Sequence, residues 1–247
     1  GAVAGSDLRG GRAAVFGGGG GVKVEVIGGA RLYLGDCREV LSSLGPVDAL
    51  VTDPPYGMSW NTSSTRFTGG NRKCGDGRSD WGAIEGDAEP FDPVPLLVYP
   101  RVVLFGANHY AAKLPVGTTL VWVKKNDHAF GTFLSDAELA WMKGGHGVYL
   151  HRAIDCPTTR SMENLGRGPA HPTQKPISLM RWAMERAKVP AGGLVVDPYM
   201  GSGTTGVAAI LSGRRFVGVE RDARYFDTAC ERIGAAQHHG SLFAGTA

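Results

Sequence analysis

One segment, residues 195–206, constrains the fold more than any other, because it combines a strand, a tight turn and a helix in immediate succession. The apolar strand ends at Asp197, and the residues after it carry glycines at the spacing G-x-G-x-x-G. These glycines are Gly201, Gly203 and Gly206. Glycines at this spacing allow a tight turn and let a ligand approach the backbone closely. The segment therefore predicts a strand of a parallel sheet with a ligand near the glycines.

The position of this segment near the C-terminus dictates how the sheet must be connected. The next strand ends at Glu220, and only residues 221–247 follow it, too few for the rest of a doubly wound sheet. We therefore expect the missing strands to come from the N-terminal half, so that the Rossmann-like sheet is circularly permuted. Because strands and helices alternate along the chain, the expected fold class is α/β, a mostly parallel sheet with helices on both faces.

Apolar patterning predicts the remaining elements. Strands are expected at 22–27, 31–34, 49–52, 101–105, 118–124 and 138–142. Helices are expected at 36–44, 108–114, 203–211 and 222–233, and from Pro176 onward. Asp36 and Glu39 have the spacing of a capping box at the start of the first helix.

Glycine-rich and irregular stretches set the expected boundaries. Residues 1–21 include an unbroken run of glycines, which loses much backbone entropy on ordering, so we expect a flexible tail there. Residues 22–236 are assigned to a single domain and residues 237–247 to a C-terminal tail. Residues 57–92 are rich in small polar residues, and a long irregular segment inside a domain is usually functional or disordered.

Composition excludes several classes of protein. No apolar run approaches the length that spans a bilayer. The four cysteines form no C-x-x-C pair, so neither a disulfide framework nor a metal site is expected. The formal net charge of +3 permits a nucleic-acid partner without requiring one. We expect a cytoplasmic protein.

A second segment, Asp53-Pro54-Pro55-Tyr56, follows directly on the buried strand 49–52. The prolines remove two donors and fix an extended backbone, which leaves the Asp53 carboxylate and the Pro54 carbonyl as a rigid pair of acceptors. An exocyclic amino group with two hydrogens is their natural partner, and the Tyr56 ring offers a flat surface to a planar base. Hydrogen bonds to both acceptors would localise the lone pair of that amine, and Asp53 would stabilise the developing positive charge. A rigid turn without chemistry is the alternative.

The acidic character of the glycine loop bears on its ligand. Asp197 would repel the pyrophosphate of a dinucleotide, and no lysine follows the glycines as a phosphate-binding loop requires. A ligand with a ribose and a cationic amino group suits this loop better, and S-adenosylmethionine is such a ligand. A glycine turn that binds nothing is the alternative.

Together the two motifs resemble the catalytic and cofactor motifs of the amino-group DNA methyltransferases. The catalytic motif comes first and the cofactor loop last, as in the beta group of that family, and the resemblance spans residues 22–233. It implies a methyltransferase sheet with a small recognition insertion and S-adenosyl-L-methionine as cofactor. One departure is Tyr199, where the family more often has phenylalanine.

The resemblance also implies roles for individual residues. The target base would be held by Asp53, Pro54, Pro55 and Tyr56. The cofactor would be bound by Asp36, Cys37, Asp53, His171, Pro172, Thr173, Lys175, Asp197, Tyr199, Gly201, Ser202, Gly203, Thr204, Thr205 and Glu220. Within this set, Asp36 would accept from the cofactor adenine and Glu220 from its ribose. On sequence alone, Lys175 is equally well explained as a surface charge at the start of a helix.

The leading aspartate of the catalytic motif implies methylation of adenine N6, because a leading serine accompanies cytosine N4 in the family. Methylation of cytosine N4 or of RNA is an alternative, as is a catalytically silent nucleic-acid-binding subunit. Methylation of cytosine C5 needs a nucleophilic cysteine in a Pro-Cys motif, whereas Cys156 precedes Pro157.

Double-stranded DNA is the implied partner, and its target base must flip out of the stack. Residues 57–92 would then be a mobile loop facing DNA, and residues 143–170 a short target-recognition region. Weak candidates for phosphate contacts are Arg66, Arg72, Lys73, Arg78, Arg152, Arg160 and Arg167. Ordinary solvated charge explains each of them equally well. The resemblance further allows a homodimer, a companion restriction endonuclease and a prokaryotic or phage-type setting.

Overall fold

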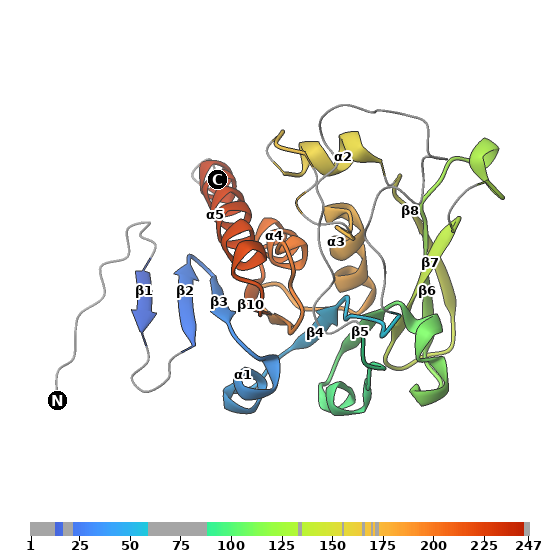
Figure 1. The fold of residues 1–247 in the computed structure, drawn as a ribbon, viewed down its shortest axis with the longest axis horizontal. Coiled ribbons are helices and arrows are strands. Elements are labelled where there is room, and N and C mark those ends of the chain that lie inside the picture. The colour runs from blue at the N-terminus through green and yellow to red at the C-terminus, as the bar shows by residue number, and fades with distance from the viewer. Residues whose placement is uncertain are drawn as a thin grey trace.

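A ten-stranded sheet organises the chain in the computed structural model, with helices on both faces (Figure 1). Its strand order is β1-β2-β3-β10-β9-β4-β5-β7-β6-β8. The residues that the structure describes are 13–16, 22–58, 88–132, 135–154, 156–164, 166–168, 170 and 173–244. No helix among them is both long enough and apolar enough to cross a membrane.

The central strands of the sheet are parallel, and they come from both the N-terminal and the C-terminal half of the chain. Its strands, in spatial order, are β3 (Ala30–Leu34), β10 (Arg215–Glu220), β9 (Leu194–Asp197), β4 (Ala49–Thr52) and β5 (Val102–Phe105). Two late strands, β9 and β10, are thus inserted between the early strands β3 and β4. The expected permuted order of the sheet is confirmed.

Antiparallel strands extend the sheet on both sides. On one side β2 (Lys23–Ile27) pairs with β3, and β1 (Ala13–Phe16) pairs with β2. On the other side β7 (Ala137–Met142) lies between β5 and β6 (Thr118–Val123), and β8 (Val148–Arg152) runs parallel to β6 at the edge.

Several boundaries differ from the sequence-based expectation. Residues 13–16 are not part of a structureless tail, because their backbone pairs with β2. Helix α5 (Ala223–Ala244) continues through most of the expected C-terminal tail. Residues 143–170 contain β8 and helix α2 (Pro157–Met162). The expected helix at 108–114 is instead two short 3-10 turns, at 107–109 and 111–113.

The central strands are buried on both faces. Helices α3 (Ile177–Arg186), α4 (Thr204–Leu211) and α5 cover one face, and helix α1 (Cys37–Ser43) lies on the other (Figure 1). Alternate side chains of β4 belong to different core clusters, Val51 on the α3 side and Leu50 on the opposite side. Burial on both faces explains why β4 and β5 are continuous apolar runs in the sequence.

Candidate functional site

Four acidic residues lie at or just beyond the carboxyl ends of neighbouring parallel strands. Asp36 follows β3, Glu220 ends β10, Asp197 ends β9 and Asp53 follows β4. Ligands of open α/β sheets bind in the crevice outside the carboxyl ends of the strands. The strand order therefore brings the two sequence motifs, which are far apart in the chain, to one edge of the sheet.

The Asp197 carboxylate joins these two motifs directly. The Thr52 hydroxyl, one residue before the Asp-Pro-Pro-Tyr motif, donates a hydrogen bond of 2.6 Å to Asp197 Oδ1. The Thr205 hydroxyl donates to Oδ2 at 2.6 Å, and the Tyr199 backbone N–H donates to Oδ1 at 3.0 Å. Asp197 is only 2% exposed, so its carboxylate braces the glycine loop against β4 from within the protein.

Burial raises the pKa of Asp197 to about 6, although the three donors oppose the shift. In the unfolded chain this carboxyl loses its proton near pH 4, before the folded protein does. We therefore expect its contribution to the free energy of unfolding to fall by about 3 kcal/mol as the pH rises from about 4 to 6. Urea unfolding of the wild type and Asp197→Asn at several pH values measures this slope. Parallel profiles for the two proteins would contradict it.

A buried arginine holds the other side of the glycine loop. Arg232 of α5 is 3% exposed, and its Nη1 donates to the Ser202 carbonyl at 2.7 Å, the Ser202 hydroxyl at 2.9 Å and Thr204 Oγ1 at 3.1 Å. Burial lowers the pKa of this guanidinium to about 10. The hydroxyls of Ser202 and Thr204 thus serve the internal packing of the loop. Sequence reasoning missed Arg232, which resembles any basic residue of a helix until its burial is known.

Glu220 connects the glycine loop to β10. One of its carboxylate oxygens, Oε2, accepts from the Gly201 backbone N–H at 2.9 Å. The other oxygen, Oε1, accepts from the backbone N–H groups of Arg221 and Asp222, both at 2.8 Å. Burial raises the pKa of Glu220. The carboxylate is therefore fixed in place, and its oxygens have further capacity to accept hydroxyl hydrogens.

Asp36 caps helix α1, as the sequence predicted. Its Oδ1 accepts from the Arg38 backbone N–H at 2.9 Å, and the exposed Arg38 guanidinium pairs with Oδ2 at 2.5 Å. These contacts lower the pKa of Asp36 to about 2. Its neighbour Cys37 is 7% exposed and packs in a cluster with Tyr199, and burial raises the pKa of its thiol.

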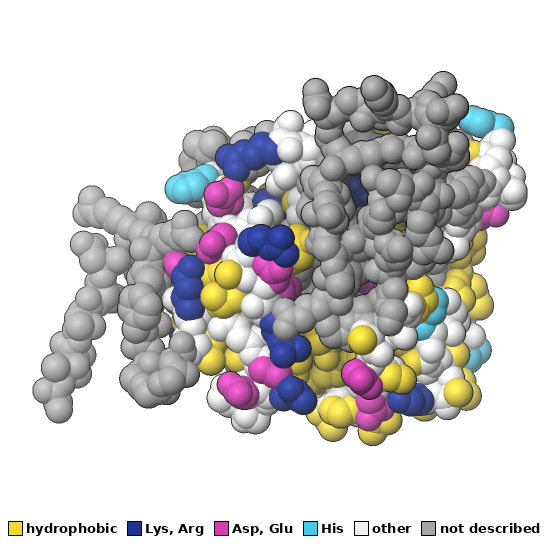
Figure 2. Space-filling view, viewed as in Figure 1, with side chains coloured by type: hydrophobic (Ala, Val, Ile, Leu, Met, Phe, Trp, Pro, Cys, Tyr) yellow, Lys and Arg dark blue, Asp and Glu magenta, His cyan; other side chains and the backbone are white. Residues whose placement is uncertain are grey.

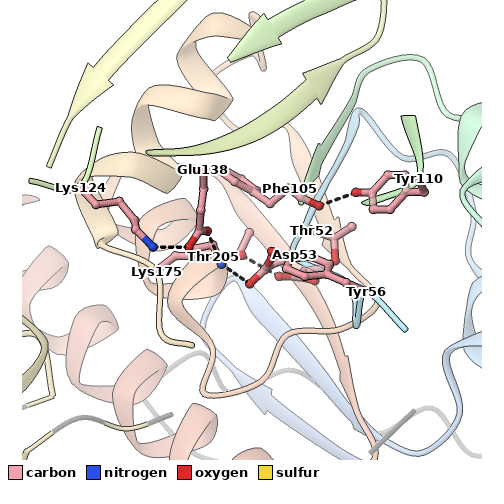
Figure 3. A network of polar contacts seen from close by, with 10 residues as sticks. Thr52, Asp53, Tyr56, Phe105, Tyr110, Lys124, Glu138, Lys175 and Thr205 are labelled. Atoms are coloured by element: carbon pink, nitrogen blue, oxygen red, sulfur yellow. Dashed lines mark hydrogen bonds and ion pairs between the residues drawn. The ribbon is translucent and has the colours of Figure 1, made fainter. Parts of the chain in front are cut away.

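The Asp53 carboxylate is held at both oxygens. Tyr56 Oη donates to Oδ1 at 2.5 Å, and Lys175 Nζ contacts Oδ2 at 2.6 Å (Figure 3). Burial raises the pKa of Asp53, and the Lys175 ammonium opposes that shift. Lys175 is 6% exposed, so it is not the surface charge that the sequence left open. Its ammonium binds the leading residue of the Asp-Pro-Pro-Tyr motif.

The same lysine contacts a second carboxylate that sequence reasoning missed. Glu138 of β7 lies 3.2 Å from Lys175 Nζ through Oε2 and 2.7 Å from Lys124 Nζ through Oε1. Figure 3 shows Lys175 between Glu138 and Asp53. Burial disfavours ionisation of Glu138, but the two lysines outweigh it and lower its pKa to about 2. The two carboxylates outweigh burial at Lys175 and raise its pKa.

The Tyr56 ring depends on a glycine beneath it. Gly106, at the end of β5, has φ +71°, and a Cβ built there would lie 2.0 Å from the ring. On another side the ring stacks on His109, with centroids 4.7 Å apart and planes 13° from parallel. Tyr56 is thus held where its hydroxyl reaches Asp53.

We expect Gly106→Ala to destabilise the protein by about 2 kcal/mol, because the new methyl group clashes with Tyr56 and the backbone remains left-handed. Thermal unfolding measures the loss. Gly131→Ala is a matched control, because Gly131 also has φ +71° but no atom lies within 4 Å of its Cβ position. Equal losses in the two variants would show backbone strain alone and would exclude the clash with Tyr56.

Some predicted site residues lie outside the described part of the chain. These are His171, Pro172, Arg66, Arg72, Lys73 and Arg78, with most of the expected loop 57–92. Thr173 is described and exposed.

The described candidates for DNA contacts carry acidic partners or lie in α2. Arg152 pairs with Asp127 at 2.6 Å, Arg167 pairs with Glu231 at 2.5 Å, and Arg160 belongs to α2. On the face seen in Figure 2, the visible basic side chains lie beside acidic ones rather than in a continuous strip. Their role in binding DNA stays a prediction.

Comparison with known proteins agrees with this architecture. The strand order, the glycine loop and the acidic edge define a methyltransferase-type α/β domain. The model of the DNA methylase family matches residues 103–231, more than half of the chain. The chain therefore belongs to the N6/N4 family of DNA methylases.

Individual relatives differ in how much they share with the chain. The DNA adenine methyltransferase YhdJ of Escherichia coli strain K12 is 41% identical over 71 residues, which are 29% of this chain and 24% of YhdJ. The solved M1.HpyAVI–SAM complex has a TM-score of 0.50 at 21% identity, over 83% of this chain and 98% of that chain. The cytosine-N4-specific PvuII DNA methyltransferase has a TM-score of 0.52 at 15% identity, over 85% and 92%. The two solved structures show that the fold is shared.

Proposed function

We propose that this chain is a DNA methyltransferase that uses S-adenosylmethionine to methylate N6 of an adenine flipped out of DNA. One observation carries the proposal. The Asp-Pro-Pro-Tyr motif and the glycine loop follow the neighbouring parallel strands β4 and β9, and the Thr52–Asp197 hydrogen bond of 2.6 Å joins them. A methyl donor at the loop would therefore lie beside the carboxylate that receives the acceptor amine.

The residues at the sheet edge fit S-adenosylmethionine. Glu220 and Asp36 offer carboxylate oxygens for ribose hydroxyls and an amino group, and Gly201 and Gly203 turn the backbone without side chains. The acidic edge also suits the cationic part of the cofactor. When bound, S-adenosylmethionine supplies an electrophilic methyl group. The solved complex of M1.HpyAVI with this cofactor supports the assignment.

The acceptor side is built to hold an amino group. The Asp53 carboxylate contacts the Lys175 ammonium and keeps lone pairs beyond those used by Lys175 and Tyr56. With the Pro54 carbonyl, it would accept both hydrogens of an exocyclic amine and stabilise the positive charge that develops there. No covalent link to the protein is needed.

Adenine is proposed as the base because the motif begins with aspartate and because YhdJ is a DNA adenine methyltransferase. Cytosine N4 is the second candidate, because the PvuII enzyme of that specificity shares the fold. Double-stranded DNA is the proposed partner. A homodimer and a companion restriction endonuclease stay predictions from the family resemblance.

Transfer of a labelled methyl group tests the function. The chain is incubated with labelled S-adenosylmethionine and with DNA duplexes that together cover many short sequences, and the digested nucleosides are separated. Label in N6-methyladenine is the expected result, and label in N4-methylcytosine would move the assignment to the second candidate. Transfer to RNA and not to DNA would contradict the proposed partner, and no transfer to any substrate would contradict the function.

A further inference from the structure

Four buried or half-buried charges of alternating sign form a chain that ends at Asp53. The order is Lys124, Glu138, Lys175 and Asp53, with successive N···O distances of 2.7, 3.2 and 2.6 Å. Each residue comes from a different part of the fold. Lys124 follows β6 and Glu138 lies in β7. Lys175 precedes α3 and Asp53 follows β4. Four elements thus place one charge each to build this chain (Figure 3).

Lys175 is the most buried member, with 6% of its side chain exposed, against 15% for Lys124, 19% for Asp53 and 28% for Glu138. It lies closer to Asp53 than to Glu138, so Asp53 holds the tighter contact. An ammonium shared between two carboxylates neutralises each of them less than an exclusive partner would. Glu138 therefore weakens the grip of Lys175 on Asp53.

Lys124 lowers the energetic cost of burying the Glu138 carboxylate near Asp53. A lone buried carboxylate at position 138 would be costly beside Asp53, because like charges repel in a poorly solvated site. Lys124 offsets that cost at Oε1 and leaves Oε2 directed toward Lys175. The chain of charges is neutral overall, so it can be buried without an uncompensated ion.

We propose that Glu138 is a positioning residue of the acceptor site, which shares the Lys175 ammonium with Asp53 and so keeps the Asp53 carboxylate a stronger hydrogen-bond acceptor for the acceptor amine. This inference rests on the proposed function, because it assigns Asp53 to the amine. Neither the family comparison nor the sequence motifs single out Glu138. It acts through its ion pair with Lys175 and through the repulsion between its carboxylate and that of Asp53.

Other groups also act on Asp53 and must stay constant in a test. Tyr56 donates to Asp53, and Tyr110 and Asp197 lie close enough to interact with it electrostatically. His109 stacks on Tyr56. Together with Lys175, Glu138 and Lys124, these are the titratable groups around the carboxylate that the structure describes.

Glu138→Gln is the direct test, because it removes the charge and keeps the shape. Titration of the protein labelled with ¹³C at aspartate carboxyl groups reports the pKa of Asp53, with Asp53→Asn to assign its signal. We expect the pKa of Asp53 to fall by about one pH unit in Glu138→Gln, because Lys175 then serves Asp53 alone. Lys124→Gln is expected to move it the opposite way. This readout needs no turnover.

Kinetic measurements on Glu138→Gln distinguish a positioning role of Glu138 from an effect on folding. We expect kcat of Glu138→Gln to fall about tenfold at neutral pH while KM for DNA and for the cofactor changes less than twofold. The acid limb of the kcat profile should move to lower pH. Asp136→Asn is the matched control: it is also an acid-to-amide change in the β6–β7 hairpin, and Asp136 pairs with Lys125 rather than with the chain of charges. Asp136→Asn should leave both kcat and the pKa of Asp53 unchanged.

The outcomes are distinct. An unshifted or raised pKa of Asp53 in Glu138→Gln would overturn the inference, as would a lowered pKa with unchanged kcat. If Glu138→Gln does not fold, the direction of the shift in Lys124→Gln decides, and a shift to lower pKa contradicts the inference. Failure of the proposed function shows differently, as wild-type protein that transfers no methyl group to DNA or RNA while its Asp53 titration responds as expected.

Discussion

Replacing Asp53 by alanine is expected to slow methyl transfer by about a hundred- to a thousandfold, the loss typical of removing one group that stabilises transition-state charge. The variant loses the carboxylate that Lys175 and Tyr56 orient, and with it one of the two acceptors for the amine. Cofactor binding should change less than about threefold, because the contacts of Glu220 and of the glycine loop are independent of Asp53.

Single-turnover transfer to DNA measures the rate, and titration calorimetry measures cofactor binding. Asp53→Asn is the isosteric companion, which keeps one acceptor oxygen and loses the charge, and it should lie between alanine and the wild type. Asp136→Asn again controls for the general loss of an acid. Turnover close to wild type in Asp53→Ala would remove Asp53 from the mechanism and leave the motif as a rigid turn.

Replacing Lys175 by methionine is expected to cost about 3–5 kcal/mol of stability, because it leaves two carboxylates without their shared partner. Asp53 and Glu138 both lie within 3.2 Å of its ammonium. Adding Glu138→Gln should restore part of the loss, since it removes the repulsion between the carboxylates of Glu138 and Asp53. Urea unfolding of the single and double variants measures both effects. A single variant as stable as the wild type would contradict the buried ion pairs.

The stability of Lys175→Met should also depend on pH, in a direction that can be tested. In the wild type the pKa of Glu138 is lowered to about 2, so its stabilising contribution is present above its unfolded pKa and is lost as the pH falls toward 2. Without Lys175 the two buried carboxyls bind protons more readily in the folded state. Between about pH 7 and 5 the stability of Lys175→Met relative to wild type should therefore rise as the pH falls. A relative stability that does not change over this range would contradict the assignment.

Much of the fold was readable from local patterns. Short apolar runs that end in an acid located β4 and β9, and the glycine spacing located the turn before α4. The expected interleaving of early and late strands is confirmed. The edge strand β8 was missed because its apolar run, Val148-Tyr149-Leu150, is short, and these side chains are exposed at the edge of the sheet. Strand β1 was missed because backbone pairing holds it, and residue type signals that weakly.

The residues of the candidate site also differ in whether the sequence could reveal them. Asp53, Asp197 and Glu220 stand in recognisable motifs, so their approximate place at one sheet edge could be predicted. Glu138 and Arg232 belong to no motif that the sequence displays, and their importance comes from burial beside charges or hydroxyls. Lys175 had two interpretations in the sequence, and its burial against Asp53 selected one of them.

By itself, the sequence determined most of the central strands and helices and the rigid acceptor motif, because these depend on residues close together in the chain. Only the tertiary structure decided which charges meet. Lys124, Glu138 and Lys175 approach Asp53 because four elements converge at one end of the sheet. The strength and protonation of such contacts depend on distance and burial, and neither quantity is encoded in sequence spacing.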